Sequence, residues 1–268
     1  MSIFTAFGSV DSPQQWINCL GGNVNSYPTT GTTLFDVSGN NLNGTLAGGP
    51  AYNSNNGGYI TFDGVNDWVD FGYASKPAGT VYDQTSYSWG GWFLLPTSGT
   101  TYIPFMCKGG PNTTTYGWSL ALGRLNGTTF QASIVTTNAA NSISGQAGTN
   151  ANVTNPTGNI AANTWYFVFA TLDWGNAQGN SAGTRRLTAY VANNTTKTVV
   201  AGTPATTTQA WLRGSIVNGW NMGQNTVNSP STTYYAFSTG NIEVYTGIAL
   251  SAQQVAEVYN KNKGLYGY

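Results

Sequence analysis

The sequence predicts an all-β fold, a sandwich of two antiparallel sheets that ends in one short helix. Short segments of alternating apolar and polar residues recur along the chain, and turns rich in Gly, Asn and Asp separate them. Two longer segments are apolar on both faces, as in the interior strands of packed sheets. All-β sandwiches of about 200–250 residues often form one domain. We therefore expect one domain over 32–268, preceded by an arm or edge segment over 1–31.

The segment 57–72 shows the alternation most clearly. Ile60 and Phe62 share one face of a first short strand, and Val69 and Phe71 share one face of a second. The Gly, Asn and Asp residues between them tolerate the positive φ angles of tight turns. The pattern predicts a hairpin whose four apolar side chains face the core, each contributing roughly 1.5–3 kcal/mol on burial.

The two segments that are apolar on both faces, 87–95 and 164–173, are predicted to be central strands. The remaining strands are expected to be shorter. They are a turn and strand over 36–46, a pair at 103–108 and 116–122, and a strand over 187–193 that ends in an Asn-Asn turn.

Two stretches have no clean period. Residues 1–30 are interrupted by Gly21-Gly22 and Pro28, and we expect an edge strand and loops of the same sandwich there. An arm that reaches a neighbouring subunit is the alternative. Residues 138–163 consist almost entirely of Asn, Ala, Thr, Ser and Gly, which predicts a long surface loop.

The C-terminal segment carries the signals of a helix. Ser251 is the expected N-cap, and Gln254 three residues later completes a capping box. An apolar stripe at helical spacing follows, formed by Val255, Val258 and Tyr259. Gly264 suits the left-handed C-terminal cap.

Several motifs stand in order along the chain. Asp36 opens Asp-Val-Ser-Gly-Asn-Asn-Leu-Asn-Gly-Thr, and Phe-Asp-Gly at 62–64 precedes Asn-Asp-Trp-Val-Asp-Phe. Lys108-Gly-Gly then precedes Tyr-Gly-Trp-Ser-Leu, and Leu187 opens Leu-Thr-Ala-Tyr-Val-Ala-Asn. This series resembles laminin-G-like domains of the concanavalin A-like lectin/glucanase superfamily. The resemblance implies a two-sheet antiparallel jelly-roll sandwich, and it also implies a short strand within 219–223.

The closing segment carries a narrower resemblance. Ala-Leu-Ser-Ala-Gln-Gln-Val begins the helix, and Lys-Gly-Leu-Tyr-Gly follows it. This arrangement resembles the end of laminin-G-like proteins in tailed-phage particles, which implies a virion protein. Glu243 stands where the family has an Asp-Glu pair, which weakens any metal or ligand role carried over from that pair.

Charge is unusually sparse. Only 7% of the residues are charged, against about 25% in typical domains. A surface of this kind suits packing against other proteins, because few charges need desolvation; a domain kept soluble by uncharged polar groups is the alternative. The formal net charge is zero, and nucleic-acid binding draws its affinity from Lys and Arg on phosphates, so we expect no nucleic-acid partner.

The cysteines and the N-terminal sequence indicate the cell compartment in which the chain is made. The chain begins without a basic segment and apolar core, and no apolar run reaches membrane-spanning length. We therefore expect synthesis in the reducing cytoplasm of a host cell, with Cys19 and Cys107 as free thiols and no membrane insertion.

Catalytic patterns are absent from the sequence. The chain has no histidine, which excludes a Ser-His-Asp triad. Glycosidases use paired carboxylates, yet the two glutamates, Glu243 and Glu257, lie in the last strand and on the terminal helix. From this the sequence predicts that the chain is not an enzyme.

Two kinds of binding site are conceivable. Asp63, Asn66 and Asp67 crowd one turn and are candidate calcium ligands, while the plainer alternative is that they only close the turn. Sugars stack on exposed aromatic rings, for which Trp118, Trp174 and Trp220 lie near strand ends. Large aromatic residues are more often core, so no ligand-binding residue is chosen.

Together these observations favour a non-enzymatic virion structural protein of a tailed phage, exposed on the particle surface as a capsid decoration or fibre-associated subunit. Its expected partners are other virion proteins and copies of itself, with host surface glycans as a further ligand. The alternative is a lectin-like carbohydrate-binding adhesin without a structural role. A glycan hydrolase is the third and least favoured hypothesis.

Overall fold

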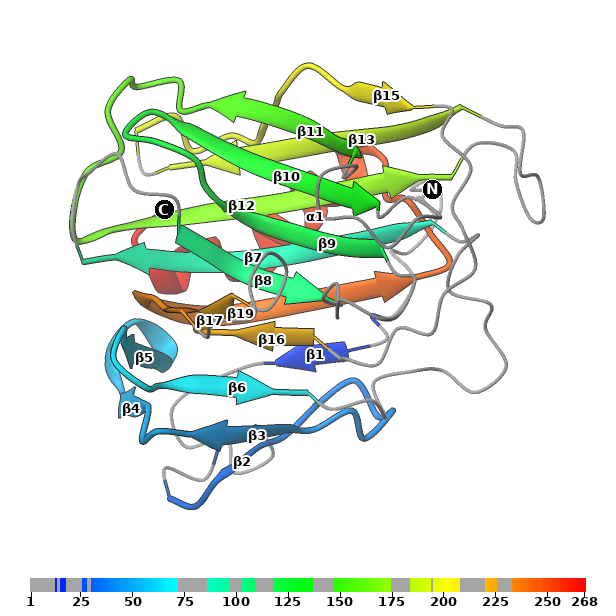
Figure 1. Ribbon diagram of the computed structural model, residues 1–268. Helices are drawn as coiled ribbons and strands as arrows, with labels where there is room; N and C mark the ends of the chain where they lie inside the picture. The colour runs from blue at the N-terminus through cyan, green and yellow to red at the C-terminus, as the bar shows by residue number, and fades with distance from the viewer. Residues whose placement is uncertain are drawn as a thin grey trace, which may run out of the picture.

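The computed structural model describes residues 13, 15–17, 26–27, 30–71, 86–96, 103–108, 118–136, 147–174, 184–193, 195–207, 220–225 and 233–268. Two antiparallel sheets are stacked face to face, and the C-terminal helix α1 (Ala252–Asn262) lies behind one of them (Figure 1). This architecture confirms the predicted two-sheet antiparallel sandwich with a short C-terminal helix.

The sheet next to α1, called the helix-side sheet here, has nine strands among the described residues. Its main order is β14-β13-β12-β7-β19-β5-β4, with β1 paired to β19 and β15 paired to β13. The strands are β1 (Gln15–Ile17), β4 (Ala51–Asn53), β5 (Tyr59–Asp63), β7 (Tyr87–Leu95), β12 (Thr164–Asp173), β13 (Arg185–Ala192), β14 (Val200–Ala201), β15 (Ala205–Thr207) and β19 (Ala236–Thr246).

The second sheet, called the front sheet because it faces the viewer in Figure 1, has eight described strands in the order β11-β10-β9-β8-β16-β6-β3-β2. They are β2 (Thr33–Leu34), β3 (Gly44–Ala47), β6 (Trp68–Asp70), β8 (Ile103–Lys108), β9 (Trp118–Arg124), β10 (Thr129–Thr136), β11 (Ala147–Thr154) and β16 (Trp220–Met222). Short elements complete the described chain: η1 (Asn55–Gly57), β17 (Gln224–Asn225), β18 (Thr233–Tyr234) and η5 (Lys263–Tyr266).

Strands β7 and β12 are central, as their double-sided apolar sequences predict. β7 lies between β12 and β19, and both β7 and β12 are buried on both faces. The N-terminal segment contributes β1, which pairs with β19 within the same sheet. The predicted edge strand in this region is thus found as a strand of the sandwich.

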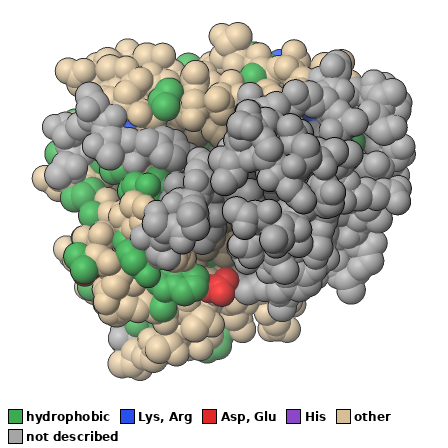
Figure 2. Space-filling model, in the orientation of Figure 1, with side chains coloured by type: hydrophobic (Ala, Val, Ile, Leu, Met, Phe, Trp, Pro, Cys, Tyr) green, Lys and Arg blue, Asp and Glu red, His purple; other side chains and the backbone are tan. Residues whose placement is uncertain are grey.

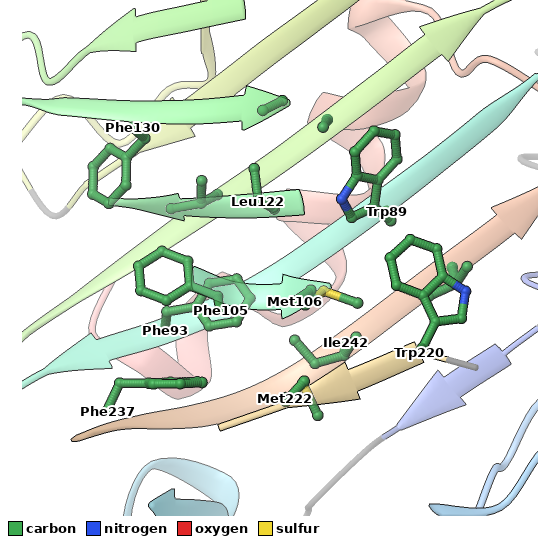
Figure 3. Packing of buried hydrophobic residues seen from close by; sticks show 14 of the residues in the cluster. Trp89, Phe93, Phe105, Met106, Leu122, Phe130, Trp220, Met222, Phe237 and Ile242 are labelled. Atoms are coloured by element: carbon green, nitrogen blue, oxygen red, sulfur yellow. The ribbon is translucent and has the colours of Figure 1, made fainter. Parts of the chain in front are cut away.

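The core fills the space between the sheets with aromatic side chains. Phe93 of β7 and Phe105 of β8 stack across it, with ring centroids 4.3 Å apart, and Trp89 and Trp220 pack at 6.1 Å. Figure 3 shows these rings pointing toward one another from opposite sheets. Cys107 of β8 is buried as a free thiol, and burial raises its pKa to about 12. Cys19 lies outside the described residues.

The predicted hairpin at 57–72 is wrong in its pairing. β5 belongs to the helix-side sheet, where it pairs with β4 and β19, while β6 belongs to the front sheet, where it pairs with β3 and β16. The turn therefore leads from one sheet to the other. The burial of all four apolar residues (Ile60, Phe62, Val69 and Phe71) is confirmed, because both strands face the same core from opposite sides.

The long loop expected over 138–163 is also wrong in part. β11 forms within it and pairs with β10 along its whole length. Ala151 and Val153 are buried in the core while Asn150 is exposed, so the strand does alternate between its two faces. Its buried residues are small, and the alternation is therefore weak in the sequence. Residues 138–146 lie outside the described residues.

The helix signals are confirmed at the start and wrong at the end. The Gln254 N–H donates to Ser251 Oγ, the Ser251 N–H donates to Gln254 Oε1, and the predicted stripe is buried. The helix ends at Asn262, its C-cap Lys263 has right-handed geometry, and Gly264 lies inside η5. The left-handed cap is instead Gly267, at φ 85° and ψ 26°, because a 3₁₀ turn extends the helix by four residues.

The surface of the described chain agrees with the sparse charge of the sequence. On the face shown in Figure 2, red and blue side chains are sparse among the described atoms, and uncharged polar and apolar groups dominate. Among the described residues, no helix has the length and apolar character needed to cross a membrane.

Gly240 supports a test of the C-terminal packing. A Cβ at Gly240 would collide with the ring and hydroxyl of Tyr266, whose oxygen accepts the Asn241 N–H at 2.8 Å and whose ring stacks on Trp92. We expect Gly240→Ala to lower the free energy of unfolding by about 1–3 kcal/mol, as overpacking does. Urea denaturation measures the effect.

Gly264→Ala is the matched control. A Cβ at Gly264 meets no atom within 4 Å, and its backbone is not left-handed. This substitution should leave stability within about 0.5 kcal/mol of the parent. Equal losses from both substitutions would contradict the assigned packing of Tyr266.

Candidate functional site

The three candidate calcium ligands lie in the turn between β5 and β6. Asp63 Oδ1 accepts the N–H of Val65 at 2.7 Å and of Asn66 at 3.3 Å, and Asp67 Oδ2 accepts the Asp63 N–H at 3.0 Å. Both aspartate side chains are thus already used to close the turn, which is the plainer of the two interpretations of this cluster. No cluster of three or more His, Cys, Asp or Glu side chains suited to a metal ion occurs among the described residues. The calcium site stays a prediction.

The two aspartates of this turn differ in pKa. Asp63 is exposed, and its pKa is lowered mainly by the hydrogen bond that its carboxylate accepts from the Val65 N–H. Asp67 is buried, and desolvation raises its pKa, with the charge of Asp63 adding to the rise. The turn therefore favours one ionised carboxylate at Asp63 and opposes a second at Asp67.

A cleft of about 250 Å³ lies elsewhere, on the outer face of the helix-side sheet beside the start of α1. Its floor is formed by alternate residues of β12 and β13, because the residues between them fill the core. The full lining is Thr171, Asp173, Arg186, Thr188, Tyr190, Ala249, Leu250, Ser251 and Ala252.

Two threonine hydroxyls lie on the floor of the cleft. Thr171 and Thr188 are directly opposite on neighbouring strands and are 4% and 6% exposed. Neither hydroxyl has a hydrogen-bond partner within the described part of the chain. Neither oxygen is among the fully buried polar atoms that lack a partner, so both hydroxyls reach the open part of the cleft and can bond a ligand or water that enters it.

Charged groups of both signs stand at the mouth. Asp173 and Arg186 are exposed and directly opposite each other on β12 and β13. Among the described lining residues, Asp173 is the one carboxylate and Arg186 the one cation. The cleft thus combines two threonine hydroxyls, the carboxylate acceptor of Asp173, the guanidinium donor of Arg186 and the ring of Tyr190. These groups suit a small polyhydroxylated ligand.

Ser88 of β7 fixes the rim of the cleft. Its hydroxyl accepts the Leu250 N–H at 2.9 Å and donates to the Ile248 carbonyl at 3.0 Å. The capping box at Ser251 then starts α1 immediately beside the floor. The rim is thus a fixed segment whose backbone is held by the sheet beneath it.

The residues singled out from the sequence lie elsewhere. Trp174 and Trp220 are buried in the core between the sheets, and the side chain of Trp118 is outside the described part. Glu243 is buried under α1, where it accepts the Tyr245 hydroxyl at 2.5 Å and pairs with Lys261 at 3.3 Å. None of these residues lines the cleft.

One sequence signal could have indicated the cleft. The outer face of β12 carries aromatic residues at Trp165, Phe167 and Phe169 and then changes to Thr171 and Asp173. A change from aromatic to polar residues on one face of a strand indicates the point beyond which no helix packs over that face. Segments 186–190 and 249–252 are far away in sequence, so only the fold brings them to this point.

Comparisons by sequence find no relative: no protein-family model matches the chain, and no curated protein matches it. Membership of the laminin-G-like family therefore remains an expectation.

Comparisons by structure find the same sandwich in other proteins. The binding domain of botulinum neurotoxin DC, solved with rat synaptotagmin II, aligns with a TM-score of 0.59 and 14% identity over 94% of this chain and 52% of that one. Trypanosoma rangeli sialidase in complex with sialic acid aligns with a TM-score of 0.54 and 13% identity over 90% and 32%. An arabinofuranosidase complexed with arabinofuranosyl-α-1,2-xylobiose aligns with a TM-score of 0.53 and 12% identity over 88% of this chain and 51% of that one.

These matches show the fold alone. The chain spans about half the length of the neurotoxin domain and the arabinofuranosidase, and about a third of the sialidase. The prediction that the chain is not an enzyme is overturned by them, because two proteins that share the sandwich are enzymes. Since fold does not determine function, the likeness assigns no activity to this chain.

Asp63 provides a pH-dependent test of the turn. Its pKa is lowered in the folded protein, so its contribution to stability is full above the ordinary aspartate value of about 3.9 and disappears as pH falls through the folded value. We expect Asp63→Ala to unfold at lower urea concentration than the parent at pH 7, with the difference shrinking below about pH 3.9. A difference that is constant with pH would contradict this role.

Proposed function

We propose that this chain is a glycan-binding module and that its ligand occupies the outer cleft beside α1. The observation that carries the proposal is the pair of threonine hydroxyls on the cleft floor, at Thr171 and Thr188, which line the cleft and form no hydrogen bond with the described chain. Sugars present many hydroxyls that both donate and accept, so they satisfy such groups better than an apolar ligand does.

The neighbouring groups suit the same ligand. Asp173 accepts hydrogen bonds from hydroxyls, Arg186 donates them, and Tyr190 offers part of an aromatic ring. The structural comparisons support this choice of ligand class, since one protein that shares the fold was solved with sialic acid and another with an arabinofuranosyl-xylobiose.

We further propose that the module is displayed on the surface of a tailed-phage particle, as a capsid decoration or fibre-associated subunit made in the host cytoplasm. Two observations support this role: the closing segment resembles those of phage laminin-G-like proteins, and the described surface is poor in charge. Its partners would be other virion proteins and copies of itself. A lectin-like adhesin without a structural role is the alternative.

Removal of both floor hydroxyls tests glycan binding. Valine at positions 171 and 188 keeps the shape of threonine and removes two hydrogen-bonding groups. Because each hydrogen bond contributes about 0.5–1.5 kcal/mol, the loss of two in Thr171→Val/Thr188→Val should weaken binding about fivefold or more on a glycan array. The urea midpoint should change little, since neither hydroxyl bonds another described residue and valine has nearly the same shape as threonine.

Thr149→Val on β11 is the control, because Thr149 lies in the other sheet. It should leave glycan binding unchanged. Binding that survives in the double variant would show that the ligand sits elsewhere.

The particle role has a separate test. Mass spectrometry of purified particles and a cryo-EM map should place this chain on the outer surface of the head, tail or fibre. Particles that contain no copy of the chain would contradict the structural role and leave the adhesin alternative.

A further inference from the structure

We infer that the sugar held in the cleft carries a carboxylate, and that Arg186 together with the first turn of α1 recognises this charge. The inference rests on the proposed glycan-binding function and goes beyond it, because it names the chemical class of the ligand. Three features of the described chain support it. Arg186 forms no ion pair with a described residue, the first turn of α1 contains no acidic side chain, and Asp173 lies directly opposite Arg186.

Arg186 is available to a ligand. It is exposed at the cleft mouth and forms no ion pair with any described residue. The preceding residue, Arg185, points to the opposite face of β13, where its guanidinium lies 4.1 Å from the centre of the Trp174 ring in the core. Adjacent arginines thus have different roles, one in packing and one facing the cleft. A guanidinium can donate two parallel hydrogen bonds to a carboxylate.

The start of α1 adds positive potential on the other side of the cleft. The helix has eleven residues, and its first turn contains no acidic side chain that would neutralise the N-terminal end. Aligned peptide dipoles place about half a positive charge there, which favours an anionic group. Ser251 and Ala252 line the cleft, so this end of the helix is beside the ligand.

Asp173 and the two threonines orient the ligand. Residues directly opposite on antiparallel strands have Cβ atoms about 4.5–5.5 Å apart, so a ligand at the mouth contacts both Asp173 and Arg186. Asp173 repels a carboxylate and accepts sugar hydroxyls. The anionic group therefore lies toward Arg186 and α1, and the ring hydroxyls lie toward Asp173, Thr171 and Thr188.

The size of the cleft suits one sugar ring. Its volume of about 250 Å³ is near the lower limit of about 300 Å³ typical of small-molecule sites. A single uronic or sialic acid residue of a longer glycan would occupy it, with the rest of the chain extending past the exposed mouth.

Matched acidic and neutral probes test the inference. The pairs are sialyllactose with lactose, and trigalacturonate with its methyl ester, measured by isothermal titration calorimetry on the full chain. We expect the parent to bind one acidic probe at least about tenfold more tightly than its neutral partner. The preference should decrease as NaCl rises from about 50 to about 500 mM, because salt screens exposed charges.

Arg186→Gln should lower the affinity for the acidic probe about tenfold or more and change the affinity for the neutral probe little. Lys197→Gln is the matched control: it removes one positive charge from an exposed turn after β13 that does not line the cleft, and it should leave both affinities unchanged. Arg186 is exposed, so equal melting temperatures are expected for the three proteins.

The outcomes separate this inference from the proposed function. Equal binding of acidic and neutral probes, or equal losses of both in Arg186→Gln, would overturn the acidic-sugar inference and leave glycan binding intact. Absence of binding to these probes and to every glycan on the array would overturn the proposed function, and the inference with it.

Discussion

The helix-side sheet has two apolar faces, and the need to cover both of them determines the rest of the structure. β7 and β12 present large side chains alternately to each side, so neither face can be left to water. The front sheet covers one face. Helix α1 and the aromatic tail cover the other, where Trp92 stacks on Tyr266 with ring centroids 4.4 Å apart. The C-terminal segment is therefore part of the core, although it comes last in the chain.

The cleft exists where this cover ends. The outer face of the sheet is aromatic under α1 and becomes polar at Thr171 and Asp173 on β12 and at Arg186 and Thr188 on β13. Ser88 holds the incoming backbone of α1 at this boundary. The same interactions that seal the apolar part of the sheet thus position the helix start beside the polar part, and packing creates the cleft.

The shared sandwich is compatible with several activities. It occurs in a neurotoxin binding domain, a sialidase and an arabinofuranosidase at identities of 12–14%, so the architecture tolerates almost complete change of sequence. Function must therefore be argued from the groups in a site. Here those groups are hydroxyls, one carboxylate and one guanidinium on the outer face, away from the Asp63–Asp67 turn that the motif pattern emphasised.

The sequence by itself determined the elements whose signals are local. Alternation identified the buried residues of 57–72, double-sided apolarity identified β7 and β12, and the capping box located the start of α1, because each depends on neighbouring residues only. The tertiary structure decided what depends on distant partners. Alternation specifies which face is buried but not which sheet a strand joins, so β5 and β6 separated. β11 formed from weakly apolar residues because β10 offered it a partner, and the cleft required three segments that only the packed sheet brings together.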